Sequence, residues 1–224
     1  MNDIPMHKPL DLMLTSLGGD GETAIRMAAM CHADRGDFRV IVPDTAASAA
    51  TLLALAAESI VMSDTSALGP VDPQVFLPAR DGFFPAKDIL KIVDDLDQRT
   101  KENPHAFELY SALLADIDAV LYQTAKAAIG RTGELVPEVL RLRRPPPEDE
   151  MIKDITKNLQ SSPMHSATIG HARASDLGLP AIYMRPQSTE WDMLWRLHAH
   201  SVYHLGPSPR SNLIEGRRVS FTFG

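Results

Sequence analysis

The stretch VPDTAASAATLLALAAESIVMSDTSALGPVDP, residues 42–73, carries the clearest fold signal in the chain. Residues 48–57 are mostly alanine and leucine, which are good helix formers, so they predict a short helix. The apolar run SIVMS at residues 59–63 predicts a buried strand, and DTSALGP after it predicts a turn. The segment FRVIVP at residues 38–43 predicts a strand before the helix. This order indicates a βαβ unit of a mainly parallel sheet.

The same alternation continues toward the N-terminus. Residues 10–16 predict a strand, LGGDG predicts a turn, and residues 22–34 predict a helix. Beyond Pro85 the pattern changes to long amphipathic helices, predicted at residues 85–99 and 107–129. The chain is therefore expected to be an α/β domain with a helical extension.

The last third of the sequence mixes loops and short helices. Three consecutive prolines in RLRRPPPEDE cannot lie inside a helix or a sheet, so this segment predicts a loop. Short helices are expected at residues 151–159 and 170–177, and a helix with a terminal strand after Pro186.

Composition excludes several classes of protein. With 224 residues and 44% hydrophobic side chains, the chain is long and apolar enough for a folded core. The net charge of -7 argues against nucleic acid as a partner, since phosphate binding needs a basic face. A single cysteine, Cys31, cannot form an intramolecular disulfide. No apolar run reaches the roughly 18 residues of a membrane helix, and no signal-peptide pattern is present, so a cytoplasmic location is expected.

Two segments carry groups suited to acyl-transfer chemistry. Ser48 precedes the alanine-rich helix, where serine is commonly an N-cap but can also be a nucleophile. Gly18 and Gly19 directly follow a strand, and glycines there form a tight turn or expose N–H groups to an oxyanion. The residues alone leave both alternatives open at each position.

A carboxylate and an imidazole complete the candidate set. Asp72 lies in LGPVDPQ, as a turn residue or as a fixed carboxylate that orients an imidazole. His165, in SSPMHSATIGHA, is the first candidate imidazole, and His171 is the second. No histidine pair is judged to have metal-binding spacing: His198 and His200 are two residues apart, which does not place them on one helical face. No metal or organic cofactor is expected.

Together, LTSLGGDGETA, VPDTAASAATLLALAAESIVM, SALGPVDPQ and MHSATIGHARASDLGL resemble the serine dehydrogenase proteinase family, distant relatives of the Clp protease proteolytic subunit and signal peptide peptidase A. The similarity spans about residues 10–181. It implies the Clp/crotonase fold, a spiral of ββα units with a largely parallel sheet. We expect a peptidase domain at residues 1–185 and a C-terminal helix and strand extension at residues 186–224, a candidate oligomer contact.

The resemblance also implies roles for individual residues. Ser48 matches the nucleophile, and the N–H groups of Gly18 or Gly19 and of Ala49 match the oxyanion hole. Asp72 falls where the Clp subunit has its histidine, and His165 falls near its aspartate, so the two partners are exchanged. His165 would then act as the base and Asp72 would orient it, which makes the chain a serine endopeptidase.

This sequence departs from the family pattern at two positions beside these residues. Leu17 stands where members usually have proline, and Ala50 stands where they usually have glycine. The added methyl group of Ala50 is expected to crowd the substrate.

Three alternatives use the same fold. Signal peptide peptidase relatives use a Ser–Lys pair, and Lys87 and Lys91 stand 39 and 43 residues past Ser48. An ordinary solvated helix face is the preferred interpretation of both lysines, so replacing Lys87 with alanine should leave the rate unchanged. Crotonase relatives use the oxyanion hole for acyl-CoA chemistry without a serine nucleophile. The third alternative is an inactive scaffold.

The resemblance implies partners as well. A peptide or protein is the expected substrate, with a membrane protein as one candidate, and a region outside this chain would supply any membrane association. Relatives form rings or stacks, so a homo-oligomer is expected. The segment Trp191–Leu205 is either an oligomer contact or, as preferred, the last core helix of the domain.

Overall fold

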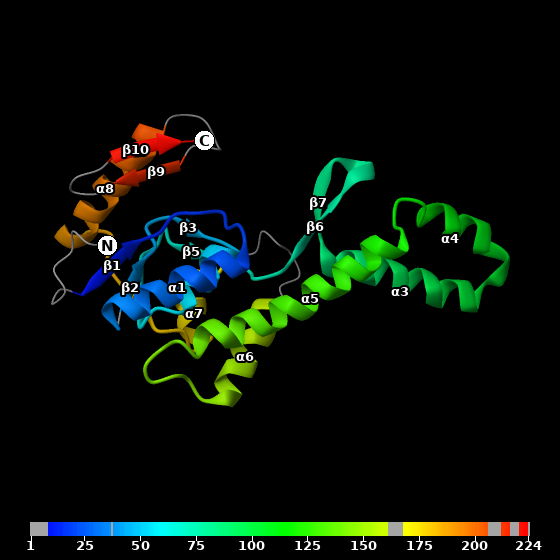
Figure 1. The fold of residues 1–224 in the computed structure, drawn as a ribbon, viewed down its shortest axis with the longest axis horizontal. Helices are drawn as coiled ribbons and strands as arrows, with labels where there is room; N and C mark the ends of the chain where they lie inside the picture. Colours follow the sequence, from blue (N-terminus) through cyan, green and yellow to red (C-terminus); the bar gives the residue numbers. More distant parts are fainter. Residues whose placement is uncertain (1–8, 37, 161–167, 206–211, 216–219, 224) are drawn as a thin grey trace.

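The computed structural model describes residues 9–36, 38–160, 168–205, 212–215 and 220–223. An α/β body carries a projecting helical arm (Figure 1). The central sheet is parallel throughout, and its strands lie in the order β1 (Leu10–Met13), β2 (Phe38–Ile41), β4 (Ser59–Met62) and β8 (Ala181–Tyr183). The predicted α/β class with a largely parallel sheet is confirmed.

The other described elements surround this sheet or form the arm. In chain order they are α1 (Gly21–Arg35), β3 (Thr45–Ala46), α2 (Ala49–Leu55), β5 (Ala67–Leu68), β6 (Gln74–Leu77), η1 (Pro78–Arg80), β7 (Gly82–Pro85), α3 (Ala86–Glu102), η2 (Pro104–Ala106), α4 (Phe107–Leu113), α5 (Ala119–Leu140), α6 (Asp149–Gln160), α7 (His171–Asp176), α8 (Thr189–Leu205), β9 (Asn212–Glu215) and β10 (Ser220–Phe223).

The two middle strands send alternate side chains into two apolar layers. Val40 and Ile60 are paired in the register and belong to the main core, which includes α1 and α2. Ile41 and Val61, one position further along, pack with Trp191 of α8 instead. Because successive residues of a strand point to opposite faces, helices cover both faces of the sheet. All seven residues of α2 are buried, which explains its alanine and leucine composition.

A second layer of very short strands lies just beyond the carboxyl ends of the central strands. Strands β3 and β5 follow β2 and β4 in sequence and pair in parallel. Isolated bridges join Ser16 to Ala46 and Leu68 to Ile169. This layer brings together the chain segments before α1, before α2 and before the arm. Ligand sites in parallel α/β folds commonly lie at this end of the strands.

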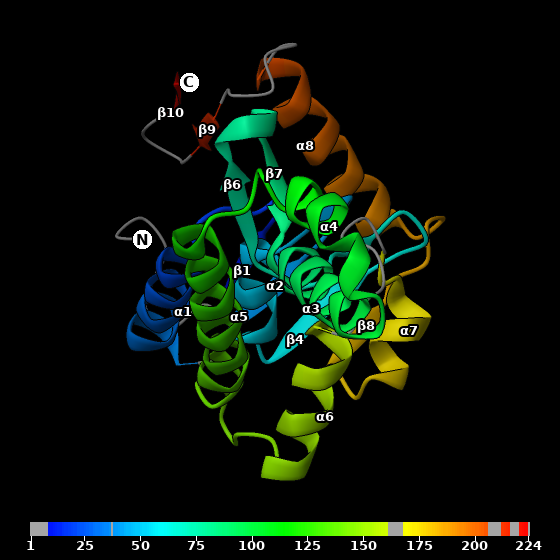
Figure 2. The same ribbon diagram turned by 90° about the vertical axis from the view of Figure 1, so that its right-hand side faces the viewer.

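The arm begins with an antiparallel hairpin of β6 and β7, which no sequence prediction covered, and continues through α3, α4 and α5 (Figures 1 and 2). A small apolar cluster of Val75, Ala86, Ile89 and Ala125 joins the hairpin, α3 and α5. Helix α5 then runs back over the body, where it packs against α1, α2 and α6.

The prediction of one helix over residues 107–129 is wrong. Helix α4 ends at Leu113, and α5 starts at Ala119. Asp118 is the N-cap of α5, because its side chain accepts a hydrogen bond from the Leu121 N–H at 2.7 Å. Helix α5 also continues through Pro137 to Leu140, because its second half is buried in the main core. The burial of this segment outweighs the low helix propensity of glycine and proline.

The C-terminal region consists of α8 and the antiparallel pair β9–β10, where one terminal strand was expected. Trp191 is 3% exposed and fixes the start of α8 on the sheet. The expected domain boundary at residue 185 falls between β8 and α8, and it stays a prediction. No helix within the described ranges combines the length and apolar character needed to cross a bilayer.

Candidate active site

Ser48 lies in a sharp turn between β3 and α2. Its backbone has φ 52° and ψ −119°, and its side chain makes no capping hydrogen bond to α2. A residue other than glycine in this region of φ/ψ space is strained by about 1–3 kcal/mol, and such strain concentrates at functional sites. A serine on a strained strand-to-helix turn is how hydrolases expose a nucleophile. The N-cap interpretation of Ser48 is therefore wrong in its essential feature, the cap bond.

Two glycines allow the neighbouring chain segments to approach this turn. Gly18 has φ 112°, and a Cβ on it would lie 2.7 Å from Ser48 Cβ and 2.8 Å from the Ala47 carbonyl oxygen. A Cβ on Gly69 would lie 2.7 Å from Ala47 Cβ and 2.9 Å from Ala47 Cα. Any side chain at either position would push the serine turn away from its neighbours.

A buried threonine holds the serine turn to the loop that carries Asp72. The Thr51 side chain is in α2, and its Oγ1 lies 2.8 Å from the Ala46 carbonyl and 2.9 Å from the Gly69 carbonyl. The same oxygen accepts the Gly69 N–H at 3.2 Å. Sequence reasoning missed Thr51, although a threonine inside an otherwise apolar helix is a usable signal, because a buried hydroxyl needs partners.

Replacing Gly69 with alanine should lower the free energy of unfolding by about 1–3 kcal/mol, because the new methyl group meets backbone and side chain of Ala47 with no room to move. Chemical denaturation measures this change. The matched control is Gly130→Ala in α5, where an added Cβ meets nothing within 4 Å. That variant should gain about 0.5–1 kcal/mol, as expected for a glycine inside a helix. Equal stability of the two variants would refute the close approach at Gly69.

Backbone N–H groups beside Ser48 differ in their availability. The Gly18 N–H donates to Ser16 Oγ at 3.1 Å, so it is already engaged. The Ala49 N–H is the first of α2 and has no partner within the helix. The Gly19 N–H makes no hydrogen bond to any residue in the described part of the chain. Of the two glycines named by the sequence, Gly19 is the better oxyanion donor in this structure.

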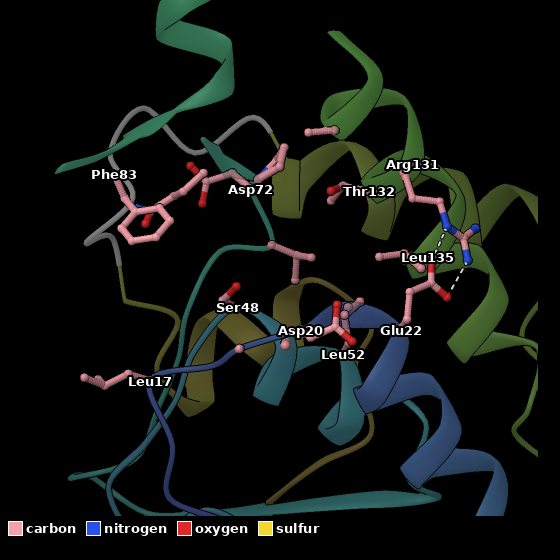
Figure 3. A pocket seen from close by; sticks show the side chains of 17 residues that line it. Leu17, Asp20, Glu22, Ser48, Leu52, Asp72, Phe83, Arg131, Thr132 and Leu135 are labelled. Atoms are coloured by element: carbon pink, nitrogen blue, oxygen red, sulfur yellow. Dashed lines mark hydrogen bonds and ion pairs between the residues drawn. The ribbon is translucent and has the colours of Figure 1, made fainter. Parts of the chain in front are cut away.

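A cavity of about 590 Å³ opens beside the serine. Figure 3 shows Ser48, Asp72 and Phe83 along one side and the side chains of α5 along the other. The cavity is lined by Leu17, Gly19, Asp20, Gly21, Glu22, Ser48, Ala49, Leu52, Val71, Asp72, Pro73, Gln74, Phe83, Ala128, Arg131, Thr132 and Leu135.

The two departures from the family pattern have different surroundings. Ala50 is buried in the main core and is not among the lining residues, so the structure does not support the expected crowding of the substrate. Leu17 lines the cavity and is 85% exposed, so it presents an apolar side chain at the mouth.

Charged side chains border the cavity where α1 meets α5. Arg131 binds Glu22 through two hydrogen bonds of 2.6 and 2.9 Å, which joins the two helices (Figure 3). The hydrogen bond from Arg131 holds the pKa of Glu22 below its usual value. Asp20 caps α1, and the hydrogen bonds from Thr23 likewise lower the pKa of the Asp20 carboxyl. Both carboxylates stay ionised at neutral pH, so this border carries fixed charge.

Asp72 is a buried carboxylate at the cavity, with a side chain only 3% exposed. Its loop is fixed on both sides: the Val71 N–H donates to the Leu159 carbonyl at 3.3 Å, and the Ala86 N–H donates to the Pro73 carbonyl at 2.9 Å. Lys87 of α3 forms an ion pair with it, and the Lys87 Nζ lies 3.5 Å from Asp72 Oδ2. The interpretation of Asp72 as an ordinary turn residue is therefore not supported.

The two candidate lysines lie in different surroundings. The Lys87 side chain is 29% exposed and pairs with Asp72, so its interpretation as part of a solvated helix face is wrong. Lys91, one turn further along α3, is exposed and does not line the cavity.

The two candidate imidazoles differ in what the structure describes of them. His165 lies outside the described residues. His171, the second candidate, begins α7, and its ring packs at 5.1 Å from that of Tyr183 without lining the cavity. The structure thus brings together Ser48, Asp72, Gly19 and Ala49, with Lys87 beside the carboxylate.

This chain is similar to one family of peptidases and to two curated proteins. A family model described as ClpP-like SDH-type serine proteinase matches residues 1–195. The chain is 33% identical over 176 residues to the uncharacterized protein MJ0137 of Methanocaldococcus jannaschii, and 28% identical over 176 residues to the uncharacterized protein MJ1495 of the same organism.

The aligned region is 78% of this chain in both cases, but 54% of the first relative and 52% of the second. The chain therefore spans about half the length of the curated relatives it matches. No solved structure matches this chain.

Proposed function

Because the chain belongs to the family of ClpP-like serine proteinases of the SDH type, we propose that it hydrolyses peptide bonds with Ser48 as the nucleophile. The observation that carries the proposal is the strained backbone of Ser48, with φ 52° and no capping bond, at the edge of a cavity. A serine that only capped a helix would have an extended backbone and a bond to the helix. The substrates are peptides or proteins.

In the proposed reaction, Ser48 Oγ attacks the scissile carbonyl carbon while His165 takes the hydroxyl proton. The N–H groups of Gly19 and Ala49 bind the tetrahedral oxyanion. The C–N bond breaks as His165 gives the proton to the leaving amine. Water, activated by the same imidazole, then releases the acid product from Ser48. Asp72 keeps the imidazole in the required tautomer and stabilises its charged form.

The hydrogen bonds around the Asp72 loop support His165 as the base. Leu159, just before the segment that contains His165, accepts a hydrogen bond from Val71. Ile169, just after it, exchanges two hydrogen bonds of 2.9 and 2.7 Å with Leu68. His165 is four residues from Ile169, a reach of at most about 14 Å. Both flanks of that segment are therefore held by the loop that carries Asp72.

The Ser–Lys dyad is the second candidate, since Lys87 is beside Asp72 at 3.5 Å. That contact also argues against the dyad, because the amine of a general base must contact the nucleophile, whereas Lys87 Nζ contacts the buried Asp72 carboxylate. We assign Lys87 instead to the counter-charge of the buried Asp72.

A fluorophosphonate probe tests the proposal, because it labels only an activated serine. Labelling of the folded chain is expected at Ser48, identified by peptide mass spectrometry, and should persist in the control Ser175→Ala, which alters an exposed serine of α7. His165→Ala should slow labelling by about 10²–10⁴-fold, the usual contribution of a general base. Lys87→Ala should change the labelling rate by less than about tenfold, since it removes a counter-charge and no proton acceptor.

Two outcomes would contradict this assignment. A collapse of labelling in Lys87→Ala but not in His165→Ala would make the lysine the base. An unlabelled but folded chain would favour the acyl-CoA enzyme or the inactive scaffold.

Three finer statements belong to the same proposal. The spiral of ββα units is supported by the parallel sheet and by the second layer formed by β3 and β5. We also propose division into residues 1–185 and 186–224, and assembly as a homo-oligomer in the cytoplasm. Because this chain spans about half of its curated relatives, the homo-oligomer and its location are proposals about the whole protein.

A further inference from the structure

Two histidines on the last two turns of α8 face each other. His200 and His204 are separated by one helical turn, and their Nε2 atoms lie 3.0 Å apart. Both side chains are exposed. The prediction that no histidine pair has metal-binding spacing missed this pair, although residues four apart lie on the same face of a helix.

The separation of the two nitrogens suits a shared metal ion. Metal–nitrogen bonds to histidine are about 2.0–2.1 Å, so two imidazoles on one ion place their nitrogens about 2.9 Å apart at an octahedral angle and about 3.4 Å apart at a tetrahedral angle. The observed 3.0 Å is a hydrogen bond between the two imidazoles, and its length lies in this range. The rings are inclined by 78° with centroids 4.3 Å apart, so the approach is nitrogen to nitrogen rather than stacking.

The helix that presents the pair is fixed to the body. Trp191 is 3% exposed and packs with Ile41 and Val61 of the sheet. Two residues before the pair, His198 is only 8% exposed, and its Nδ1 lies 3.4 Å from Thr15 Oγ1. These contacts hold one face of α8 against the body, while His200 and His204 project into solvent where an ion can reach them.

We propose that His200 and His204 chelate one divalent transition-metal ion, with Zn²⁺ as the expected ion and water filling its other positions. Imidazole nitrogens select zinc and its neighbours rather than Ca²⁺ or Mg²⁺, which prefer oxygen ligands. Within the described part of the chain, no group of three or more His, Cys, Asp or Glu side chains is arranged to hold a metal. The described residues therefore supply two ligands.

The role of this site is structural. In the helical HExxH motif of metalloproteases, a glutamate follows the first histidine and acts as general base, whereas Ser201 stands there in this chain. The ion would join the last two turns of α8, and it would do so independently of the cavity beside Ser48.

Isothermal titration of the full chain with ZnCl₂, after chelator treatment and removal of any histidine tag, tests the site. We expect one ion per chain. His200→Ala and His204→Ala should each weaken binding by at least about tenfold, because losing a ligand should cost no less than losing a group that only orients one. The matched control is His105→Ala, which removes an exposed histidine from η2 and should leave the affinity unchanged.

Far-ultraviolet circular dichroism of each variant separates ligand loss from unfolding. Unchanged affinity in both α8 variants, or an equal loss in His105→Ala, overturns the proposal. Fluorophosphonate labelling at Ser48 should be the same with and without zinc, so failure of this site and failure of the proposed peptidase are distinguishable.

Discussion

Ser48→Ala is expected to lower kcat/KM for peptide hydrolysis by at least about 10⁴-fold, because no other group in the proposed reaction can form the acyl-enzyme. The fold should be unaffected, since the hydroxyl makes no capping bond and the β3–α2 turn is held by Thr51. Hydrolysis of a casein or a fluorogenic peptide by the two proteins gives the ratio of kcat/KM, with the active fraction of the wild type measured by the fluorophosphonate probe. Activity that survives in the purified variant would remove Ser48 from the mechanism.

The variant Ser48→Gly distinguishes the catalytic role of the hydroxyl from the backbone strain at this position. Ser48→Gly relieves the positive φ, so it should raise the free energy of unfolding by about 1 kcal/mol while abolishing hydrolysis. Chemical denaturation of the two variants beside the wild type measures this difference. A less stable glycine variant would mean that the φ of 52° is not strained in this protein.

Asp72→Asn should lower kcat by about 10⁴-fold, because an amide in place of the orienting carboxylate favours the wrong tautomer of the catalytic imidazole. The side chain keeps its size, so the cavity keeps its shape. A lysine base predicts the opposite result. A lysine base needs no carboxylate to orient an imidazole, so the rate of Asp72→Asn would then stay close to that of the wild type.

Steady-state kinetics across pH measures the loss of kcat in Asp72→Asn, with Asp88→Asn as the matched control. Asp88 is one residue beyond Lys87 and exposed, so the variant removes a neighbouring negative charge without touching the cavity. A wild-type rate in Asp72→Asn would exclude the triad. An equal loss of rate in Asp72→Asn and Asp88→Asn would mean that the loss comes from the change in net charge and not from the orientation of the imidazole.

Local sequence patterns were sufficient where one element could be recognised without its neighbours. The alanine- and leucine-rich segment was correctly predicted as the helix α2, and SIVMS as the strand β4. Both elements are largely buried, and their apolar composition indicates this burial. The predicted helix at residues 107–129 failed for the opposite reason. The break before Asp118 depends on a cap, and the extension to Leu140 depends on packing against the body.

In the candidate site too, some residues could be recognised from the sequence and others only from tertiary contacts. A serine before a helix, a glycine pair after a strand and an aspartate between prolines were all visible in the sequence and in its family resemblance. Thr51 and Gly69 were not singled out, because their roles exist only when the β3 and β5 segments are side by side. Lys87 was assigned to a solvated face because its ion pair with Asp72 joins residues on different elements.

The sequence alone determined the α/β class, the peptidase family and the identity of the candidate nucleophile and carboxylate, because composition and short motifs record burial and backbone geometry residue by residue. Only the tertiary structure decided that Ser48 is strained and uncapped, that Gly19 rather than Gly18 has an available N–H, and that Lys87 faces Asp72. Those properties arise from contacts between segments distant in sequence, whose energies depend on distances that no local pattern encodes.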